Sequence, residues 1–294
     1  MRARSCWIVG LFVVVHAFSV ADAAAEGSII FADNFDGSSL AAWDDDSIVD
    51  DESRLRLSAE AAYRGEYGVE VIARPGSGAG AKLNKWFMPG YDEVYARWYC
   101  RFDEGFDQGN HMHFSHLLAN RADNKWSAFG QAGNKPGGDD FFSTGLEPWR
   151  AWGEHPAPGE MMLYAYHMDM PIDPKMNKYW GEMMRPEQPF VLERGRWYCM
   201  EMMVKANAPG KRDGVQAFWV DGREVARFGG LRWREDANLK INNFWLMLYV
   251  HQSERVNRVF FDEVVISTEY IGPLVAETAV RDSTWGRLKE KGEN

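Results

Sequence analysis

The sequence predicts an all-β fold in which two antiparallel sheets pack as a sandwich. Short runs of alternating apolar and polar residues recur along the chain, and clusters of Gly, Asp, Asn and Pro separate them. Almost no segment shows a long helical period. Many short strands with turn signals between them are typical of sandwiches, so we expect one β domain over residues 27–275.

The predicted strands are separated by recognisable turns. Asp221-Gly222 lies between the runs FWV and REVARF, and this dipeptide is typical of a tight hairpin because both of its residues tolerate a positive φ. In chain order, the expected strands cover 28–31, 54–57, 68–73, 93–102, 161–168, 197–206, 215–220, 244–250 and 259–267.

Two segments lack a clear strand pattern. Residues 103–160 are rich in Gly, His, Trp, Asp and Asn, and residues 169–195 form a second stretch of this kind. Loops of this length in a compact domain are usually functional, and their tryptophans argue against disorder. We therefore expect both segments to be long loops over one face of the sandwich.

Both ends of the chain carry separate signals. Residues 1–23 combine a basic start, an apolar stretch and small residues before a cleavage point, as a secretory signal peptide does. A membrane anchor is the alternative, but the apolar stretch is short for a span and no later one is suitable. We expect a secreted protein, extracellular or periplasmic, with no membrane partner. Residues 276–294 are predicted to form a charged C-terminal tail.

The net negative charge of the chain limits the kinds of binding partner that the protein can have. The formal net charge is −10, and loss of Arg2, Arg4 and Asp22 with the signal peptide leaves about −11. Such a chain lacks the broad basic surface that nucleic acid requires, so we expect no nucleic-acid partner, and we expect a monomer. An acidic polysaccharide would need a locally basic cleft.

Two cysteines remain after the signal peptide, and each ends the same tetrapeptide, RWYC, at Arg97–Cys100 and Arg196–Cys199. In an oxidising compartment a disulfide between Cys100 and Cys199 is expected, provided that their Cα atoms come within about 7 Å. Two buried, unpaired strand thiols are the alternative.

Several predicted strands carry a polar face. Residues two apart in a strand share a face, and in these strands one face is apolar while the other is aromatic, amide-bearing or ionisable. Such groups are not buried without partners, so the pattern predicts a sheet with one face on the core and the other lining a groove. The residues on these faces are Tyr164 and Tyr166, Glu201 and Lys205, and Asn243, Tyr249 and His251.

Three stretches resemble polysaccharide lyases of the family-14 type. They are VYARWYCRFDEGF over Val94–Phe106, the Trp149-Arg150 pair upstream of the Tyr-Ala-Tyr motif at 164–166, and RWYCMEMMVKANAPGKRDGVQAFWVDG over 196–222. The resemblance covers roughly residues 90–273. It implies a concanavalin A-like β-jelly roll, and it implies β-elimination on alginate or glucuronan-like polymers.

The resemblance also implies roles for individual residues. In those lyases the base is commonly a lysine, whereas the corresponding segment here is HMHFSHL over 111–117. Related jelly-roll lyases use histidine, so His113 or His116 is the expected base, with Tyr164 and Tyr166 as acid and assistant. A histidine with an ordinary pKa of about 6.5 suits proton abstraction near neutral pH. The expected substrate contacts are Arg150, Lys205 and Asn243 for the carboxylate, and Trp149, Glu201, Tyr249 and His251 along the groove.

Other interpretations of these residues stay open. Regular alternation places His111 and His113 on one strand face and His116 on the other, so we expect at most two of them in the groove. Three histidines so close together also suggest a metal site, but their spacing matches no zinc pattern. The loop tryptophans expected to pack or to stack on sugar rings are Trp126, Trp149, Trp152 and Trp180.

The ends of the domain suggest a further site. FADNFDG over 31–37 and FFDEV over 260–264 resemble the first and last strands of concanavalin A-like domains, where the termini pair and sometimes share a structural calcium ion. Asp33, Asp36 and Asp262 would supply hard oxygen ligands for this ion. Turn-forming aspartates without metal are the alternative. We expect that catalysis requires no cofactor.

The sequence therefore predicts a secreted polysaccharide lyase-like protein that cleaves a uronic-acid-containing polysaccharide by β-elimination in a concave groove. A non-catalytic carbohydrate-binding jelly roll that uses the same groove is the alternative, and a structural surface protein is a third possibility. Retaining glucanases of the same fold carry catalytic carboxylates as Glu-x-Asp-x-x-Glu, and this motif is absent from the sequence.

Overall fold

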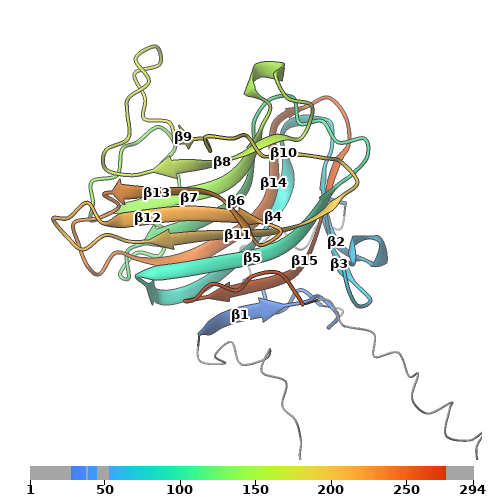
Figure 1. Ribbon diagram of the computed structural model, residues 1–294, viewed down its shortest axis with the longest axis horizontal. Coiled ribbons are helices and arrows are strands. Elements are labelled where there is room, and N and C mark those ends of the chain that lie inside the picture. Colours follow the sequence, from blue (N-terminus) through green and yellow to red (C-terminus); the bar gives the residue numbers. More distant parts are fainter. Residues whose placement is uncertain (1–27, 38, 45–52, 276–294) are drawn as a thin grey trace, which may run out of the picture.

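The computed structural model describes residues 28–37, 39–44 and 53–275, and it shows two antiparallel sheets packed face to face (Figure 1). The all-β sandwich predicted from the sequence is confirmed. The expected signal peptide at 1–23 and the charged tail at 276–294 lie outside the described residues. Within the described part of the chain, no helix is long and apolar enough to cross a membrane.

The first sheet contains eight strands over the described residues. Their order is β13-β12-β11-β5-β15-β3-β2, and β1 also pairs with β15, so that the two ends of the domain lie side by side. The strands are β1 (Ile29–Asp33), β2 (Leu55–Ser58), β3 (Gly68–Ala73), β5 (Glu93–Phe102), β11 (Trp197–Lys205), β12 (Gly214–Val220), β13 (Arg223–Leu231) and β15 (Asn257–Ser267).

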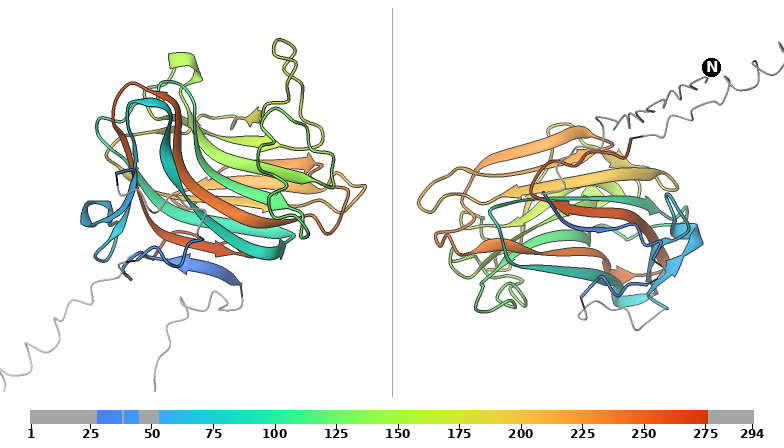
Figure 2. Two further views of the ribbon diagram at one scale, coloured as in Figure 1. Left: turned by 180° about the vertical axis from the view of Figure 1, so that it is seen from behind. Right: turned by 90° about the horizontal axis from the view of Figure 1, so that it is seen from below.

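The second sheet contains seven strands over the same residues, in the order β10-β8-β7-β6-β14-β4, with β9 paired to β8. Its long strands bend along their length (Figure 2, left). The strands are β4 (Gly76–Tyr91), β6 (Met112–Asn120), β7 (Phe141–Trp149), β8 (Gly159–Tyr166), β9 (Glu182–Met184), β10 (Val191–Leu192) and β14 (Lys240–Ser253), and the short 3-10 helices are η1 (Ala59–Ala61) and η2 (Ala151–Gly153).

The core between the sheets is rich in aromatic rings. The indole of Trp98 on β5 contacts Phe114 on β6 and Phe244 on β14, with ring centroids 6.2 and 5.8 Å apart. These contacts cross from the first sheet to the second. Burial of a large apolar side chain contributes about 1.5–3 kcal/mol. Inward-facing residues therefore hold the sheets together, and the residues between them are left to face outward.

Several strands lie where the sequence pattern does not predict them, and the longest are β4, β6 and β7. β6 and β7 fall within residues 103–160, for which loops are expected. Nearly every residue of both strands is buried, so the alternation of apolar and polar residues that identifies a half-exposed strand is weak. β4 begins with Gly76-Ser77-Gly78, a composition that indicates a turn rather than a strand.

The expected disulfide between Cys100 and Cys199 is absent, and both thiols are free and buried. β5 and β11 are neighbours, but Cys100 lies opposite Tyr198 while Cys199 lies opposite Tyr99. The cysteines are one residue out of register, so their side chains point to opposite faces of the same sheet. Cys100 belongs to the core, whereas Cys199 does not. The prediction of a bridge was wrong for this reason.

We predict that Trp98→Ala lowers the free energy of unfolding by about 3–5 kcal/mol, because it removes a fully buried indole and leaves a cavity between the sheets. Urea unfolding followed by circular dichroism measures this loss. Met176→Ala, at a side chain that is 60% exposed, should change the same free energy by less than about 0.5 kcal/mol. Equal effects of the two substitutions would contradict the place of Trp98 in the core.

Candidate active site

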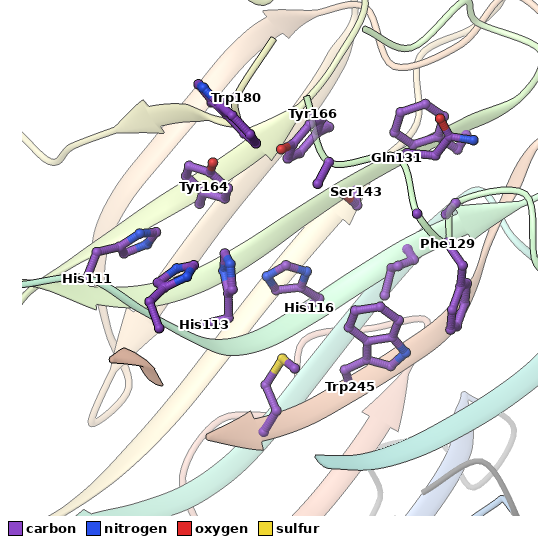
Figure 3. A pocket seen from close by; sticks show the side chains of 17 residues that line it. His111, His113, His116, Phe129, Gln131, Ser143, Tyr164, Tyr166, Trp180 and Trp245 are labelled. Carbon is purple, nitrogen blue, oxygen red and sulfur yellow. The ribbon is translucent and has the colours of Figure 1, made fainter. Parts of the chain in front are cut away.

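A pocket of about 310 Å³ opens on the outer face of the seven-stranded sheet (Figure 3). Its floor comes from β6, β7, β8 and β14, and loop residues 128–132 form part of its wall. All four residues expected to be catalytic lie in its lining, namely His113, His116, Tyr164 and Tyr166. The lining also includes His111, Gln131, Ser143, Trp180, Trp245 and His251.

One buried carboxylate holds three imidazoles. Oε2 of Glu147 on β7 lies 2.6 Å from Nε2 of His111, and Oε1 lies 2.7 Å from both Nδ1 of His113 and Nε2 of His116. An ionised carboxylate only accepts hydrogen bonds, so each of these ring nitrogens carries a proton. In a neutral imidazole the other nitrogen then has a lone pair. For His113 this nitrogen is Nε2, and 24% of the side chain is exposed, so a ligand can reach it.

An irregularity in β6 brings His116 to the same face as His111 and His113. From His111 to His116 the chain advances five residues, whereas the partner chain advances four, from Trp149 to Gly145. The extra residue is a β-bulge, and it reverses the alternation of side chains beyond it. The expectation that at most two of the three histidines enter the groove was therefore wrong, because regular alternation does not anticipate a bulge.

Two glycines leave room for the functional rings. Gly145 lies opposite His116, and a Cβ atom at this position would lie 2.4 Å from Cδ2 and 2.5 Å from Nε2 of the imidazole. A Cβ atom at Gly181 would lie 2.4 Å from Cε1 of Tyr164. A side chain at either position would therefore displace the ring, and at Gly145 it would separate His116 from Glu147.

The shared carboxylate sets the protonation of the cluster. Burial alone raises the pKa of Glu147, but the charges and hydrogen bonds of His113 and His111 outweigh it and hold this pKa well below its usual range. Burial alone lowers the pKa of His113, but the charge and hydrogen bond of Glu147 outweigh it and raise this pKa. For His116 and His251 burial dominates, and the pKa of each falls. His113 is thus a stronger base than His116.

Two phenols face the histidines from β8. The ring centroid of Tyr164 lies 5.2 Å from that of His111 and 5.8 Å from that of His113. The ring of Tyr166 lies next to that of Tyr164, with centroids 5.8 Å apart. Burial above all raises the pKa of Tyr164, so this phenol keeps its proton at alkaline pH. It can therefore donate a proton beside an imidazole that accepts one.

His251 and Tyr249 on β14 extend the cluster. Their ring centroids lie 5.1 and 5.7 Å from that of His113. His251 lines the pocket, whereas Tyr249 stands beside it and approaches the backbone of Gly78. The structure thus brings both residues to the predicted groove.

Glu201 and Lys205 lie elsewhere, on β11 of the first sheet. The Glu201 carboxylate accepts hydrogen bonds from the N–H groups of Ile271 and Gly272, and the Lys205 ammonium lies 3.5 Å from a carboxylate oxygen of Glu93. Their predicted place in the groove was wrong. A period of two shows that a strand has a polar face, but it does not show which of the two sheets carries that strand.

Arg150, Trp149 and Asn243 belong to the second sheet or its loops but do not line the pocket. The Arg150 guanidinium forms an ion pair with Asp107 at 2.9 Å. The Asn243 amide donates to Oδ1 of Asn84 at 2.6 Å, and Trp149 is buried. Their contacts with substrate stay predictions that this arrangement does not support.

Glu147 is the functional residue that sequence reasoning missed. It lies in FFSTGLEPW over 141–149, a segment for which a loop is expected. Phe142 and Leu146 of this segment pack in the core, so the alternate residues Ser143, Gly145 and Glu147 face outward. The signal that identifies Glu147 is therefore a lone carboxylate among the small residues of the opposite face, at Ser143 and Gly145.

The donor set also resembles a metal site, because ligand atoms of His111, His113 and Glu147 all lie within 4.8 Å of one another. Two ligand atoms on one tetrahedral zinc ion stand about 3.3 Å apart when each bond is about 2.0 Å long. The distances from the imidazole nitrogens to the carboxylate oxygens are instead 2.6 and 2.7 Å, which are those of charge-assisted hydrogen bonds. This geometry is that of a hydrogen-bonded cluster.

The aspartates expected to bind structural calcium have protein donors as partners. Among the described residues, they do not form a group with ligand atoms close enough together for one ion. Calcium binding stays a prediction. Each carboxylate accepts a hydrogen bond at 2.6–2.8 Å, Asp33 from the indole of Trp43, Asp36 from the N–H of Glu66, and Asp262 from the N–H of Tyr63.

No protein-family model matches the sequence, and no curated protein matches it. Solved structures do match the fold. A marine PL-14 alginate lyase from Aplysia kurodai is 15% identical, with a TM-score of 0.62 over 84% of this chain and 98% of that one. The alginate lyase Aly36B is 16% identical, with a TM-score of 0.58 over 85% and 96%. An endo-beta-1,4-glucuronan lyase from the fungus Trichoderma reesei is 17% identical, with a TM-score of 0.51 over 77% and 91%.

These similarities confirm that the chain has the jelly-roll fold expected from its resemblance to family-14 lyases. At this identity the likeness concerns the fold.

We predict that Gly145→Ala destabilises the protein by about 1–3 kcal/mol, because the added methyl group overlaps the His116 ring and the backbone of β6. Thermal unfolding measures this effect. Gly229→Ala is the matched control, since a Cβ atom there meets nothing within 4 Å. If both variants unfold at the temperature of the parent protein, Gly145 is not needed for the position of His116.

Proposed function

We propose that the protein is an exported polysaccharide lyase that cleaves a uronic-acid-containing polysaccharide by β-elimination. One observation carries the proposal: Glu147 fixes the imidazole of His113 with its lone pair available, beside the protonated phenol of Tyr164. Elimination needs a base and an acid at one sugar unit, and this pocket supplies both.

His113 acts as the base. Its Nδ1–H donates to Glu147, which fixes the tautomer and the orientation of the ring, so Nε2 is the nitrogen that takes the C5 proton of the uronate. The negative charge of Glu147 stabilises the imidazolium that forms. Glu147 itself is a positioning residue, because it is fully buried and acts through the histidines.

Tyr164 acts as the acid, with Tyr166, whose ring centroid lies 5.8 Å away, as its assistant. The electron pair of the broken C5–H bond forms the C4–C5 double bond, and the C4–O bond to the next sugar breaks. The departing oxygen takes the phenolic proton. The products are a new reducing end and an unsaturated uronyl end. The proton gained by His113 later returns through solvent to the phenolate of Tyr164.

Uncharged hydrogen-bond donors of the pocket would bind the substrate carboxylate. Among the described residues, the pocket lining contains no Arg or Lys, and its uncharged polar groups include the Gln131 amide and the Ser143 hydroxyl. Hydrogen bonds to the carboxylate lower the cost of the charge that develops at C5. Solved structures of the same fold include alginate and glucuronan lyases, which supports uronate polymers as the substrate class.

A non-catalytic carbohydrate-binding protein is the second candidate. The observation that favours it is the same lining, which includes six Phe, Tyr and Trp rings and carries no fixed cation among its described residues. Aromatic faces bind the apolar faces of sugar rings whether or not chemistry follows. An assay for turnover separates the two candidates.

We predict that the protein generates ultraviolet absorbance from unsaturated uronyl ends when it is mixed with alginate or polyglucuronate. His113→Ala should lower kcat by at least about 100-fold because it removes the base, and Tyr164→Phe should lower kcat because it removes the acid. Lys205→Ala, on the first sheet, is the control and should leave turnover unchanged. Polymer binding without any absorbance change, in the parent protein, would establish the second candidate instead.

We predict that kcat/KM rises with pH through the neutral range and reaches a plateau at alkaline pH. The base must be neutral, and Glu147 raises the pKa of His113, whereas the raised pKa of Tyr164 keeps the acid protonated. Glu147→Gln removes the charge that raises the pKa of His113, so the ascending limb should move to lower pH while the plateau falls by about tenfold or more.

The control for this pH profile is Glu182→Gln. Glu182 forms another carboxylate–imidazole pair, with His167 at 2.6 Å, but neither residue lines the pocket. Its pH profile should match that of the parent. An unchanged ascending limb in Glu147→Gln would show that His113 is not the group that titrates.

A further inference from the structure

We infer that an aromatic strip beside the histidine cluster is a second sugar-binding subsite, which takes another acidic sugar of the same polysaccharide chain. The strip consists of Trp245, Phe129 and Trp126, with Lys125 at its outer end. This inference rests on the proposed function, because it takes the pocket to hold the sugar unit that reacts.

Ring contacts connect the strip to the histidine cluster without a break. Trp245 stacks on the imidazole of His116, with centroids 5.7 Å apart and planes within 12° of parallel. Phe129 lies 5.1 Å from Trp245, and Trp126 lies 4.7 Å from Phe129. Figure 3 shows His116, Trp245 and Phe129 following one another at one end of the pocket. Each step is comparable with the length of one pyranose unit, so the strip continues the path of a bound chain.

The strip is exposed at its outer end and fixed by its own loop. Trp126 is 43% exposed. Its N–H donates to Oδ1 of Asn124 at 3.2 Å and its carbonyl accepts from the N–H of Phe129 at 3.0 Å, while the N–H of Ala128 donates to Oδ1 of Asn120 at 3.0 Å. These bonds hold the rings in place before a ligand arrives, which reduces the conformational entropy that binding would cost.

Two lysine ammonium groups lie over these rings. The Lys125 ammonium lies 4.8 Å from the ring centroid of Trp126 and 5.2 Å from that of Trp86, and the Lys82 ammonium lies 4.2 Å from that of Trp245. The whole chain carries a formal charge of −10, and these ammonium groups supply cations at the rings of the strip.

The combination of rings and ammonium groups selects a chemical class. The ring faces match the C–H face of a pyranose, and an ammonium group on a long flexible stem can reach a carboxylate on that sugar. A neutral glycan would use the rings alone. An acidic sugar uses both, so the strip favours a uronate.

Two substitutions separate the ring from the charge. Trp126→Ala and Lys125→Gln are each made in a His113→Ala background, so that the polymer is not cleaved while binding is measured by calorimetry. We expect Trp126→Ala to weaken binding of polyglucuronate or alginate roughly tenfold, as loss of one anchoring aromatic side chain does. Lys125→Gln should weaken it less and should reduce its salt dependence. A uronate disaccharide, which fills only the pocket, should bind all variants equally.

Matched controls come from other surfaces. Tyr270→Ala removes a ring that is 45% exposed and contacts Trp219 on the first sheet, and Lys211→Gln removes an exposed ammonium group. Both should bind the polymer like the His113→Ala parent. The subsite is refuted, while the proposed function stands, if Trp126→Ala binds the polymer with the affinity of the parent. It is also refuted if Trp126→Ala weakens binding of the disaccharide as much as binding of the polymer. If the parent binds no uronate polymer, the proposed function fails and the subsite fails with it.

Discussion

A buried carboxylate needs hydrogen-bond donors from the protein in place of water, and much of this site follows from how Glu147 meets that constraint. Three imidazoles donate to its two oxygens, at 2.6–2.7 Å. To bring three histidines of one strand to one carboxylate, β6 needs a bulge, because regular alternation would turn His116 away. The ring of His116 then passes over the neighbouring strand, which is possible because position 145 has no side chain.

The core and the site occupy alternate residues of the same strands, so that packing on one face positions chemistry on the other. Phe114 and Leu146 lie in the core between the sheets. Phe114 directly follows His113 in the chain, and Leu146 directly precedes Glu147. His113 and Glu147 therefore move only if the core moves. A site built on strands is held more closely than one built on loops, which suits a base that must meet a C–H proton in a fixed orientation.

The sequence predicts the architecture and half of the site because both depend on local patterns. Tyr164 and Tyr166, two apart on a half-polar strand, are found by alternation alone, and so is His251. Glu147 is not, because its strand is buried on both faces and its partners come from a bulge that no local pattern reveals. Glu201 fails for a related reason: it lies on the outer face of the other sheet, and alternation does not state to which sheet a strand belongs. The disulfide of Cys199 fails because the register of β5 and β11 places Cys100 on the opposite face of that sheet.

The hydrogen bonds of the cluster also limit how a uronate can be recognised. Each neutral imidazole has one N–H, and His111, His113 and His116 direct it at Glu147, so none of them can donate to a substrate carboxylate unless it is protonated. The base must be neutral to act, hence His113 cannot also neutralise the carboxylate. Within the described pocket, this task falls to neutral donors such as Gln131, which lower the energy of the developing charge but do not attract a polyanion from a distance. Attraction over distance requires fixed cations, and the ammonium group of Lys125 lies on the aromatic strip next to the cluster. Capture of the polymer and activation of its C5 proton are thus assigned to different, adjoining surfaces.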